Sequence, residues 1–207
     1  MLSTLLVAGL SYLIGSIPFA VIVSAAMGLQ DPRKFGSKNP GATNVLRSGN
    51  KKAAALTLIG DTLKGVLAVC LCLYAVNTWG LNPGLVGVSA LAVFLGHVYP
   101  FTLKFKGGKG VATSLGILFA LQPLLGLFCL LTWLFVFYVS RYSSLSAIIA
   151  AISAPIYYYL GSNVVWPFNG TIGICLILIS IVLLVRHQNN ISRLLQGKEP
   201  KVGTKKS

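Results

Sequence analysis

Long apolar runs separated by short polar breaks dominate the chain. Lipid offers the backbone no hydrogen-bond partner, so such a run crosses a membrane as a helix, and one span needs roughly 20 apolar residues. We therefore predict an all-α integral membrane protein. The runs cover residues 2–27, 53–79, 85–101, 111–139, 147–160 and 171–185.

The charges in the breaks between the runs predict how often the chain crosses. Basic residues fall between the first and second runs, between the third and fourth, at Arg141, and from Arg186 onward, whereas the other breaks carry no charge. The positive-inside rule places every basic segment in the cytoplasm. The run 111–139 must then cross twice, turning near Gln122–Pro123. This predicts seven transmembrane helices, with the N-terminus outside and the C-terminus cytoplasmic.

The first half of that run is short for a span. Residues 111–121 make 11 positions, about half of what the hydrocarbon core requires. Either this helix extends back into the preceding lysine-rich loop, or the bilayer thins around it.

Composition agrees with a membrane protein and excludes other classes. Hydrophobic residues make up 55% of the 207 positions and charged residues 10%, against about 25% charged residues in a soluble domain. A net charge of +14 would suggest nucleic acid in a soluble protein, but in this apolar background we expect a lipid bilayer and no nucleic acid. We predict one membrane-embedded domain over residues 1–207, with a polar cytoplasmic tail over 198–207.

The sequence has few residues that could bind a metal ion or form a disulfide framework. The four cysteines lie within apolar runs and lack CxxC spacing. Two histidines and three acidic residues offer little for a metal cage. We expect no metal and no cofactor.

The first basic loop, residues 28–52, contains a stretch of small and polar residues. It reads Gly36-Ser-Lys-Asn-Pro-Gly-Ala-Thr-Asn-Val-Leu-Arg47. Hydroxyls, amides and backbone N–H groups in such a loop can surround an anion, and Arg47 offers a two-pronged fork for phosphate. The alternative is a solvated turn whose glycine and proline only separate helices.

The second basic loop, residues 104–110, is rich in lysine and glycine. It reads Lys104-Phe-Lys-Gly-Gly-Lys-Gly110. Such a loop before an apolar helix is typical of a phosphate site at a helix N-terminus, although the Walker A spacing is absent. The alternative is a topology signal that touches lipid headgroups.

The third basic segment, residues 186–199, contains a helical stripe with His187 and Asn190 on one face. A neutral histidine beside an asparagine can bind a hydroxyl or act as a base. The alternative is an interfacial helix end with a solvated histidine.

Within the run 53–79, Asp61 and Lys64 are expected to pair and brace their helix, because unpaired charges at that depth are costly. His97 is expected to be structural.

Together these motifs resemble the acyl-phosphate:glycerol-3-phosphate acyltransferase (PlsY) family of bacterial membrane enzymes, over essentially the whole chain. The family commonly has glycine at the position of Lys38. The resemblance rests on Gly15-Ser-Ile-Pro18, the stretch 36–47, Gly60-Asp-Thr-Leu-Lys-Gly65, Gly96-His97, Pro100, the stretch 105–110, and His187, Asn190, Ile191, Arg193, Gly197 and Glu199.

The resemblance implies a seven-helix acyltransferase whose active site faces the cytoplasm from the bacterial inner membrane. It implies transfer of an acyl group from acyl phosphate to the 1-hydroxyl of glycerol 3-phosphate. The products are lysophosphatidic acid and phosphate, in the first acylation step of phospholipid synthesis. The soluble enzyme that produces acyl phosphate is suggested as a further partner, and the chain is expected to be a monomer.

The same resemblance assigns roles to residues. His187, Asn190 and Ser37 are the expected catalytic residues, and together with Arg47 and Lys109 they bind glycerol 3-phosphate. Asp61, Lys64 and Glu199 are expected to be structural. A serine at position 143, 144 or 146 is a further candidate, and the choice among them is open. The residues expected to bind acyl phosphate are Asn39, Gly41, Thr43, Asn44, Gly107 and Gly108.

The residues favour direct transfer without an acyl-enzyme. Acyl phosphate has a good leaving group, so the site has to position two anions and offset their repulsion. No acid in the matched loops is an evident triad partner for Ser37. The proton goes to His187 or to the substrate phosphate.

Two rival functions come from other classes. An anion channel or transporter is disfavoured because the spans are nearly uncharged. A structural lipid-binding protein would not need the stretch 36–47.

Overall fold

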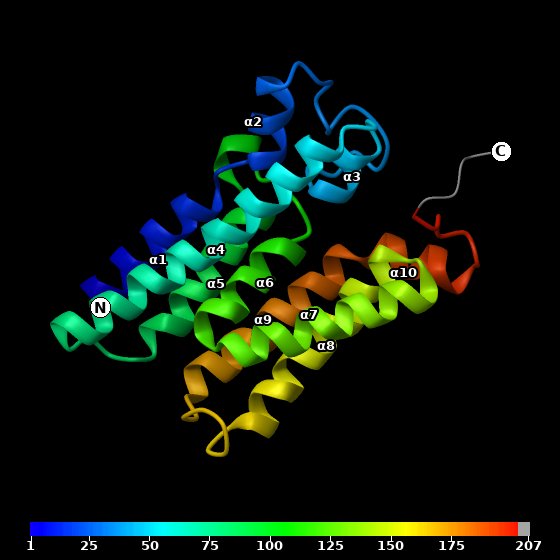
Figure 1. Cartoon of the computed structure of the whole chain (residues 1–207). Helices are drawn as coiled ribbons and strands as arrows, with labels where there is room; N and C mark the ends of the chain where they lie inside the picture. The colour runs from blue at the N-terminus through cyan, green and yellow to red at the C-terminus, as the bar shows by residue number, and fades with distance from the viewer. Residues whose placement is uncertain (203–207) are drawn as a thin grey trace.

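The computed structural model describes residues 1–202, and this part of the chain is a bundle of helices without a β-strand (Figure 1). Residues 203–207 of the predicted polar tail lie outside the described residues. The helices are α1 (Leu2–Gly15), α2 (Phe19–Ala26), α3 (Ala42–Leu46), α4 (Lys51–Trp79), α5 (Leu85–Val98), the 3₁₀ turn η1 (Phe101–Leu103), α6 (Val111–Leu121), α7 (Pro123–Ser140), α8 (Ser143–Gly161), α9 (Gly170–Arg186) and α10 (Gln188–Leu195).

Several of these helices have the length and apolarity of membrane spans, which confirms the prediction of a helical membrane fold. Helix α9 has 17 residues and becomes a sixth candidate only together with α10, from which it is bent by 59°. Helix α6, with 11 residues, is shorter. Five segments of the described residues qualify by themselves: Leu2–Ala26, Lys51–Trp79, Leu85–Leu103, Pro123–Ser140 and Ser143–Gly161.

The break expected at Gln122–Pro123 is present, and it separates α6 from α7. Pro123 is the first residue of α7, a position where its missing N–H costs nothing. Helix α6 begins at Val111, so the alternative in which it extends back into the second basic loop is wrong. The reason is packing: Gly110 has φ +90°, and a Cβ there would lie 2.1 Å from the Phe94 ring.

Small residues let the helices approach closely. A Cβ on Gly15 of α1 would lie 2.1 Å from the carbonyl oxygen of Val93 in α5. A Cβ on Gly116 of α6 would lie 2.0 Å from the carbonyl oxygen of Thr62 in α4. Such contacts are how membrane helices gain packing energy without a hydrophobic driving force.

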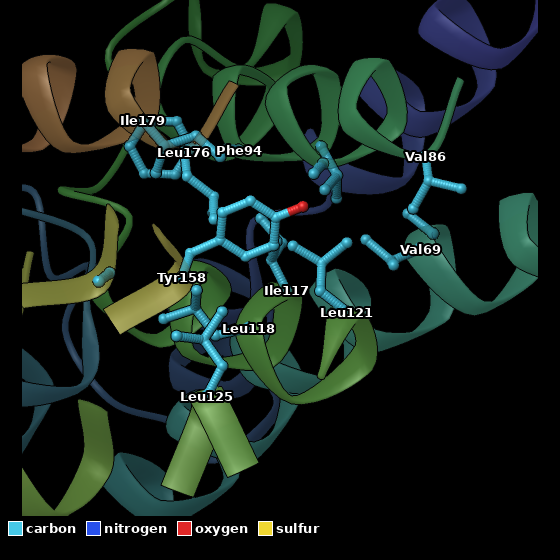
Figure 2. Packing of buried hydrophobic residues seen from close by; sticks show 14 of the residues in the cluster. Val69, Val86, Phe94, Ile117, Leu118, Leu121, Leu125, Tyr158, Leu176 and Ile179 are labelled. Carbon is cyan, nitrogen blue, oxygen red and sulfur yellow. The ribbon is translucent and has the colours of Figure 1, made fainter. Parts of the chain in front are cut away.

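The apolar core lies where α4 to α9 converge (Figure 2). Phe94, Ile117 and Leu125 are fully buried. Tyr158 of α8 is also buried, and its hydroxyl donates to the carbonyl oxygen of Asn169. Many leucines on the outer faces, such as Leu10 and Leu67, are more than half exposed, as expected of helices that face lipid rather than water.

Candidate active site

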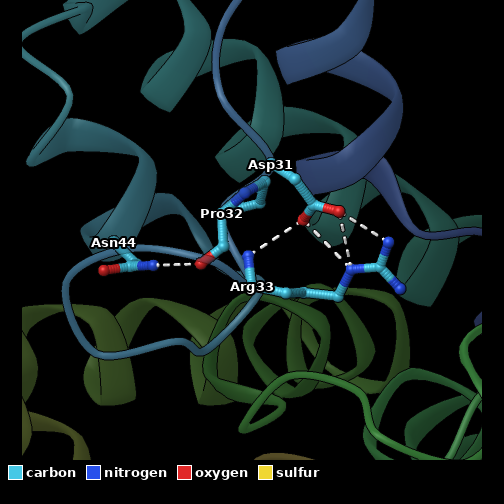
Figure 3. A network of polar contacts seen from close by, with 4 residues as sticks. All are labelled: Asp31, Pro32, Arg33 and Asn44. Atoms are coloured by element: carbon cyan, nitrogen blue, oxygen red, sulfur yellow. Dashed lines mark hydrogen bonds and ion pairs between the residues drawn. The ribbon is translucent and has the colours of Figure 1, made fainter.

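Asn44 organises the first basic loop from inside. Its side chain is buried, and its amide nitrogen donates to the carbonyl oxygens of Pro32 at 2.7 Å (Figure 3) and Phe35 at 3.2 Å. Its amide oxygen accepts from the Ser37 backbone N–H at 2.9 Å. Both amide hydrogens are therefore used within the loop. Asn44 shapes this loop, and direct contact with acyl phosphate stays a prediction.

An ion pair at the start of this loop neutralises its one acid. Arg33 donates to both carboxylate oxygens of Asp31, with the shortest contact at 2.6 Å (Figure 3). Hydrogen bonding from Arg33 lowers the pKa of Asp31. The carboxylate is thus paired and does not oppose the binding of an anion elsewhere in the loop.

The other residues predicted in this loop lie around the short helix α3. Gly41 immediately precedes α3, and Arg47 ends it with an exposed side chain. The side chains of Ser37 and Thr43 are exposed, and Asn39 is half-buried. Hydroxyl and guanidinium groups of this loop are therefore exposed at the surface of the molecule.

The glycines of the second basic loop pack against the end of α5. The N–H groups of Gly107 and Gly108 donate to the carbonyl oxygens of Val98 and His97, at 3.1 and 3.2 Å. A Cβ would lie 2.1 Å from His97 O at Gly107 and 2.1 Å from His97 Nε2 at Gly108. Close packing thus explains both glycines without a ligand. Their contact with acyl phosphate stays a prediction.

Lys109 leaves this glycine-rich loop and enters a polar cluster with α10. Its ammonium donates to the Asn190 amide oxygen. The Asn190 amide nitrogen donates to Glu199 Oε1 at 2.6 Å. Glu199 also accepts from Ser144 at 2.6 Å and, through Oε2, from Arg193 at 2.7 Å. The structure thus unites residues that are up to 90 positions apart in the sequence.

Of the three candidate serines at positions 143, 144 and 146, Ser144 hydrogen-bonds to this cluster through Glu199, and its contribution to the active site stays a prediction. Ser146 instead donates to the carbonyl oxygen of Tyr142 within its own helix. Apolar surroundings could not separate the two, because both side chains are buried in α8. Burial of the Glu199 carboxyl alone would raise its pKa, but hydrogen bonds from Ser144, Asn190 and Arg193 outweigh this and lower it.

His187 lies at the bend between α9 and α10. Its side chain is buried, and its Nδ1 lies 2.8 Å from the carbonyl oxygen of Leu183. Its own carbonyl oxygen accepts from the Asn190 N–H at 2.8 Å. The predicted stripe therefore begins with a capping residue rather than with a residue inside one continuous helix.

Charges from the first and third basic segments both shift the pKa of Lys109, which itself belongs to the second. Burial lowers the pKa of Lys109 to about 8, and the charges of Arg193, Arg186 and Arg47 lower it further, against the opposing effect of Glu199. The influence of Arg47 ties the first basic loop to the other two. A site with this much positive charge and so few acids is suited to phosphate groups.

Away from this cluster, the expected pair in α4 forms. Lys64 Nζ lies 3.0 Å from Asp61 Oδ1, and both side chains are buried. His97 Nδ1 lies 3.4 Å from the same oxygen. Among residues 1–202 no group of three or more histidine, cysteine or acidic side chains could hold a metal ion.

Known proteins match this chain over nearly its whole length. A family model described as glycerol-3-phosphate acyltransferase matches residues 5–197. A protein of that name from Bordetella petrii is 57% identical over 99% of this chain and 95% of its own. One from Bordetella avium is 55% identical over 96% and 92%.

Two crystal structures of PlsY, an integral membrane glycerol 3-phosphate acyltransferase, are similar to the whole fold. The glycerol 3-phosphate form has a TM-score of 0.87 and 40% identity, and the match covers 98% of this chain and 96% of that one. The lysophosphatidic acid form has a TM-score of 0.86 and 38% identity, with the same coverage.

Proposed function

The chain belongs to the glycerol-3-phosphate acyltransferase family, and from this premise we propose that it transfers an acyl group from acyl phosphate to the 1-hydroxyl of glycerol 3-phosphate. The observation that carries the proposal is the cluster of Lys109, His187 and Asn190, within reach of the charge on Arg47. Structures of the similar PlsY protein hold glycerol 3-phosphate in one form and lysophosphatidic acid in the other, a substrate and a product of this reaction.

The positive charge of the site suits a reaction between two anions. The glycerol hydroxyl attacks the acyl carbonyl carbon, the bond from that carbon to the phosphate oxygen breaks, and phosphate leaves with the bonding electrons. The leaving group needs little activation, so positioning and charge neutralisation carry the catalysis. Arg47 and Lys109 supply cations, and Asn190 and the Ser37 hydroxyl supply hydrogen bonds.

Acyl phosphate would lie along the first basic loop. The predicted contacts in this loop are Asn39, Gly41, Thr43 and Asn44, and Gly107 and Gly108 of the second basic loop complete the predicted set. Support comes from the exposed Thr43 hydroxyl and from the shape that Asn44 gives the loop.

For the membrane we propose seven spans, with the N-terminus outside and the site at the cytoplasmic face of a bacterial inner membrane. In Figure 1, α3 and α10 lie at one end of the bundle, and the N-terminus and the α8–α9 connection lie at the other. Arg141 lies at the same end as α3 and α10. Its carbonyl oxygen accepts a hydrogen bond from the N–H of Val202, in the segment after α10, at 3.0 Å. We place the end of the last span at Arg186, before the 59° bend.

The hydroxyl proton goes to a phosphate of the substrates rather than to His187. Burial and the nearby charge of Lys109 lower the pKa of His187 to about 4, so this imidazole resists protonation. A phosphate monoester has a second pKa of about 6 and is the better base. His187 then orients the attacking hydroxyl, and Asn190 holds His187 in position.

Purified protein given acyl phosphate and glycerol 3-phosphate is expected to form lysophosphatidic acid. With labelled acyl phosphate alone, no label should remain on the denatured protein, and initial-rate plots for the two substrates should intersect. Covalent label on Ser37 with parallel plots would replace direct transfer by an acyl-enzyme. Ion flux through vesicles without any lysophosphatidic acid would favour the channel alternative. A monomeric state and contact with the soluble acyl-phosphate-producing enzyme are further parts of the proposal.

A further inference from the structure

A buried group of ionisable side chains lies beside the proposed site but is not part of it. Asp61, at 3% exposure, faces both Lys64 and His97. Lys64 Nζ also donates to the carbonyl oxygen of Ile17 at 2.9 Å, in the break between α1 and α2. Three ionisable groups at this depth are costly to bury. The pair of Asp61 and Lys64 is sufficient to brace α4. The contact of His97 with Asp61 therefore needs a separate explanation.

His97 touches the second basic loop at two points. Its carbonyl oxygen accepts from the Gly108 N–H at 3.2 Å. The ring edge with Nε2 fills the space that a side chain on Gly108 would need. The opposite ring nitrogen, Nδ1, faces Asp61, which fixes the direction of the ring.

We infer that His97 is a positioning residue for Lys109: held by Asp61, its ring seats Gly108 and so sets the backbone from which Lys109 reaches Asn190. Gly107, Gly108 and Gly110 all pack on α5, so Lys109 carries the one side chain between Lys106 and Val111. A small shift of this backbone therefore moves the ammonium directly.

The surrounding cavity supports the same link. Asp61, Lys64 and His97 line a small cavity together with Gly108 and with Pro40 of the first basic loop. Residues of both basic loops thus border the cavity that this buried group lines.

The test uses Gly108→Ala, His97→Ala and the double variant in the full-length protein. Gly108→Ala places a methyl group against the ring, whereas His97→Ala removes the ring and makes room for it. Gly9→Ala is the matched control, because a Cβ on Gly9 of α1 meets nothing within 4 Å. If His97→Ala does not fold, His97→Asn takes its place, since it keeps a polar group but also vacates the space beside Gly108.

The first readout needs no substrate. The rate at which an amine-reactive reagent modifies Lys109, relative to the exposed Lys51, is measured by peptide mass spectrometry. We expect a severalfold rise for each single variant and no change for Gly9→Ala. The second readout, which rests on the proposed function, is the KM for glycerol 3-phosphate, expected to rise about tenfold as a charge-assisted contact is lost. A merely unstable protein would lower kcat and leave KM unchanged.

The double variant decides the inference. If the ring acts through Gly108, the double variant matches the single His97 variant within about twofold in both readouts, because the clash cannot occur without the ring. If the two effects multiply instead, or if Gly108→Ala changes neither readout, the inference is overturned. A wild-type protein that makes no lysophosphatidic acid would contradict the proposed function, and the Lys109 modification rates would still decide the role of His97.

Discussion

Lys109 carries its charge in surroundings that oppose it. Its side chain is partly buried, and the positive charges of Arg193, Arg186 and Arg47 lower its pKa. Among the charges that shift this pKa, Glu199 is the one acid that raises it. A phosphate group bound beside Lys109 would relieve this repulsion. The same surroundings make its charge sensitive to pH near neutrality, which is unusual for a lysine.

The pH dependence of catalysis should reveal this lysine. Its pKa in the free protein is about 8, so the ammonium form is lost as the pH rises through about 8. We expect kcat/KM for glycerol 3-phosphate to fall above that pH, and to fall below about 6 as the substrate phosphate gains a proton. The alkaline limb should move upward in Lys109→Arg, even though overall activity is lower. An unchanged alkaline limb in that variant would assign it to another group.

Arg47 should contribute through a forked contact with phosphate. Arg47→Ala is expected to lower kcat/KM about tenfold to a hundredfold, the range of one charge-assisted hydrogen bond. Arg47→Lys should restore only part of this, because the planar fork is lost. Lys34→Ala removes an exposed charge from the same loop and serves as the control. Equal effects of Arg47→Ala and Lys34→Ala would reduce Arg47 to a topology signal.

At the scale of elements, the first basic loop is held by its own hydrogen bonds more than by regular structure. Gly36 and Lys38 both have φ +56°, a region that costs a residue with a side chain about 1–2 kcal/mol. A glycine at position 38 would adopt the same backbone conformation without this strain. Asn44 holds the strained turn closed from within.

Asn44→Ala should open this loop. Loss of the amide leaves buried backbone groups without partners, at a cost of about 1–3 kcal/mol. We expect severalfold faster cleavage by trypsin after Arg33, Lys34 or Lys38, together with loss of transferase activity. Asn77→Ala, at an exposed position on α4, should change neither. Normal protease resistance with lost activity would instead point to direct substrate contact by Asn44.

At the scale of the whole molecule, polar chemistry gathers at one end of an apolar bundle. The basic loops, α3 and α10 share that end, while the N-terminus lies at the other (Figure 1). Between the two ends the core is apolar, apart from small polar side chains and the group around Asp61. This arrangement suits an enzyme that takes a charged substrate from water and an acyl chain from lipid.

The proposed topology is testable by accessibility in intact cells. In a variant without the four native cysteines, a single cysteine is introduced as Ser162→Cys or as Ser48→Cys. A thiol reagent that does not cross the membrane should label position 162 and leave position 48 unlabelled until the cells are opened. The reverse pattern would invert the orientation. Labelling of both positions would mean an even number of crossings between them and would overturn the seven-span count.

The amino-acid sequence by itself determined the class of fold, the break between α6 and α7, and the segments that carry the candidate site residues. These follow from local properties, because apolar length, a proline and the distribution of lysine and arginine act on the residues near them. The resemblance to the family likewise rested on short motifs such as the stretch 36–47, and the comparisons confirm it.

Only the tertiary structure decided which residues meet. It chose Ser144 over Ser146, turned the amide of Asn44 inward, and set Gly107 and Gly108 against α5. It also placed His97 between a buried carboxylate and the second basic loop. None of this is visible in the sequence. Ser144 and Glu199 are far apart in the chain, as are Asp61 and His97, and even within one loop close packing rather than periodicity fixes which groups touch.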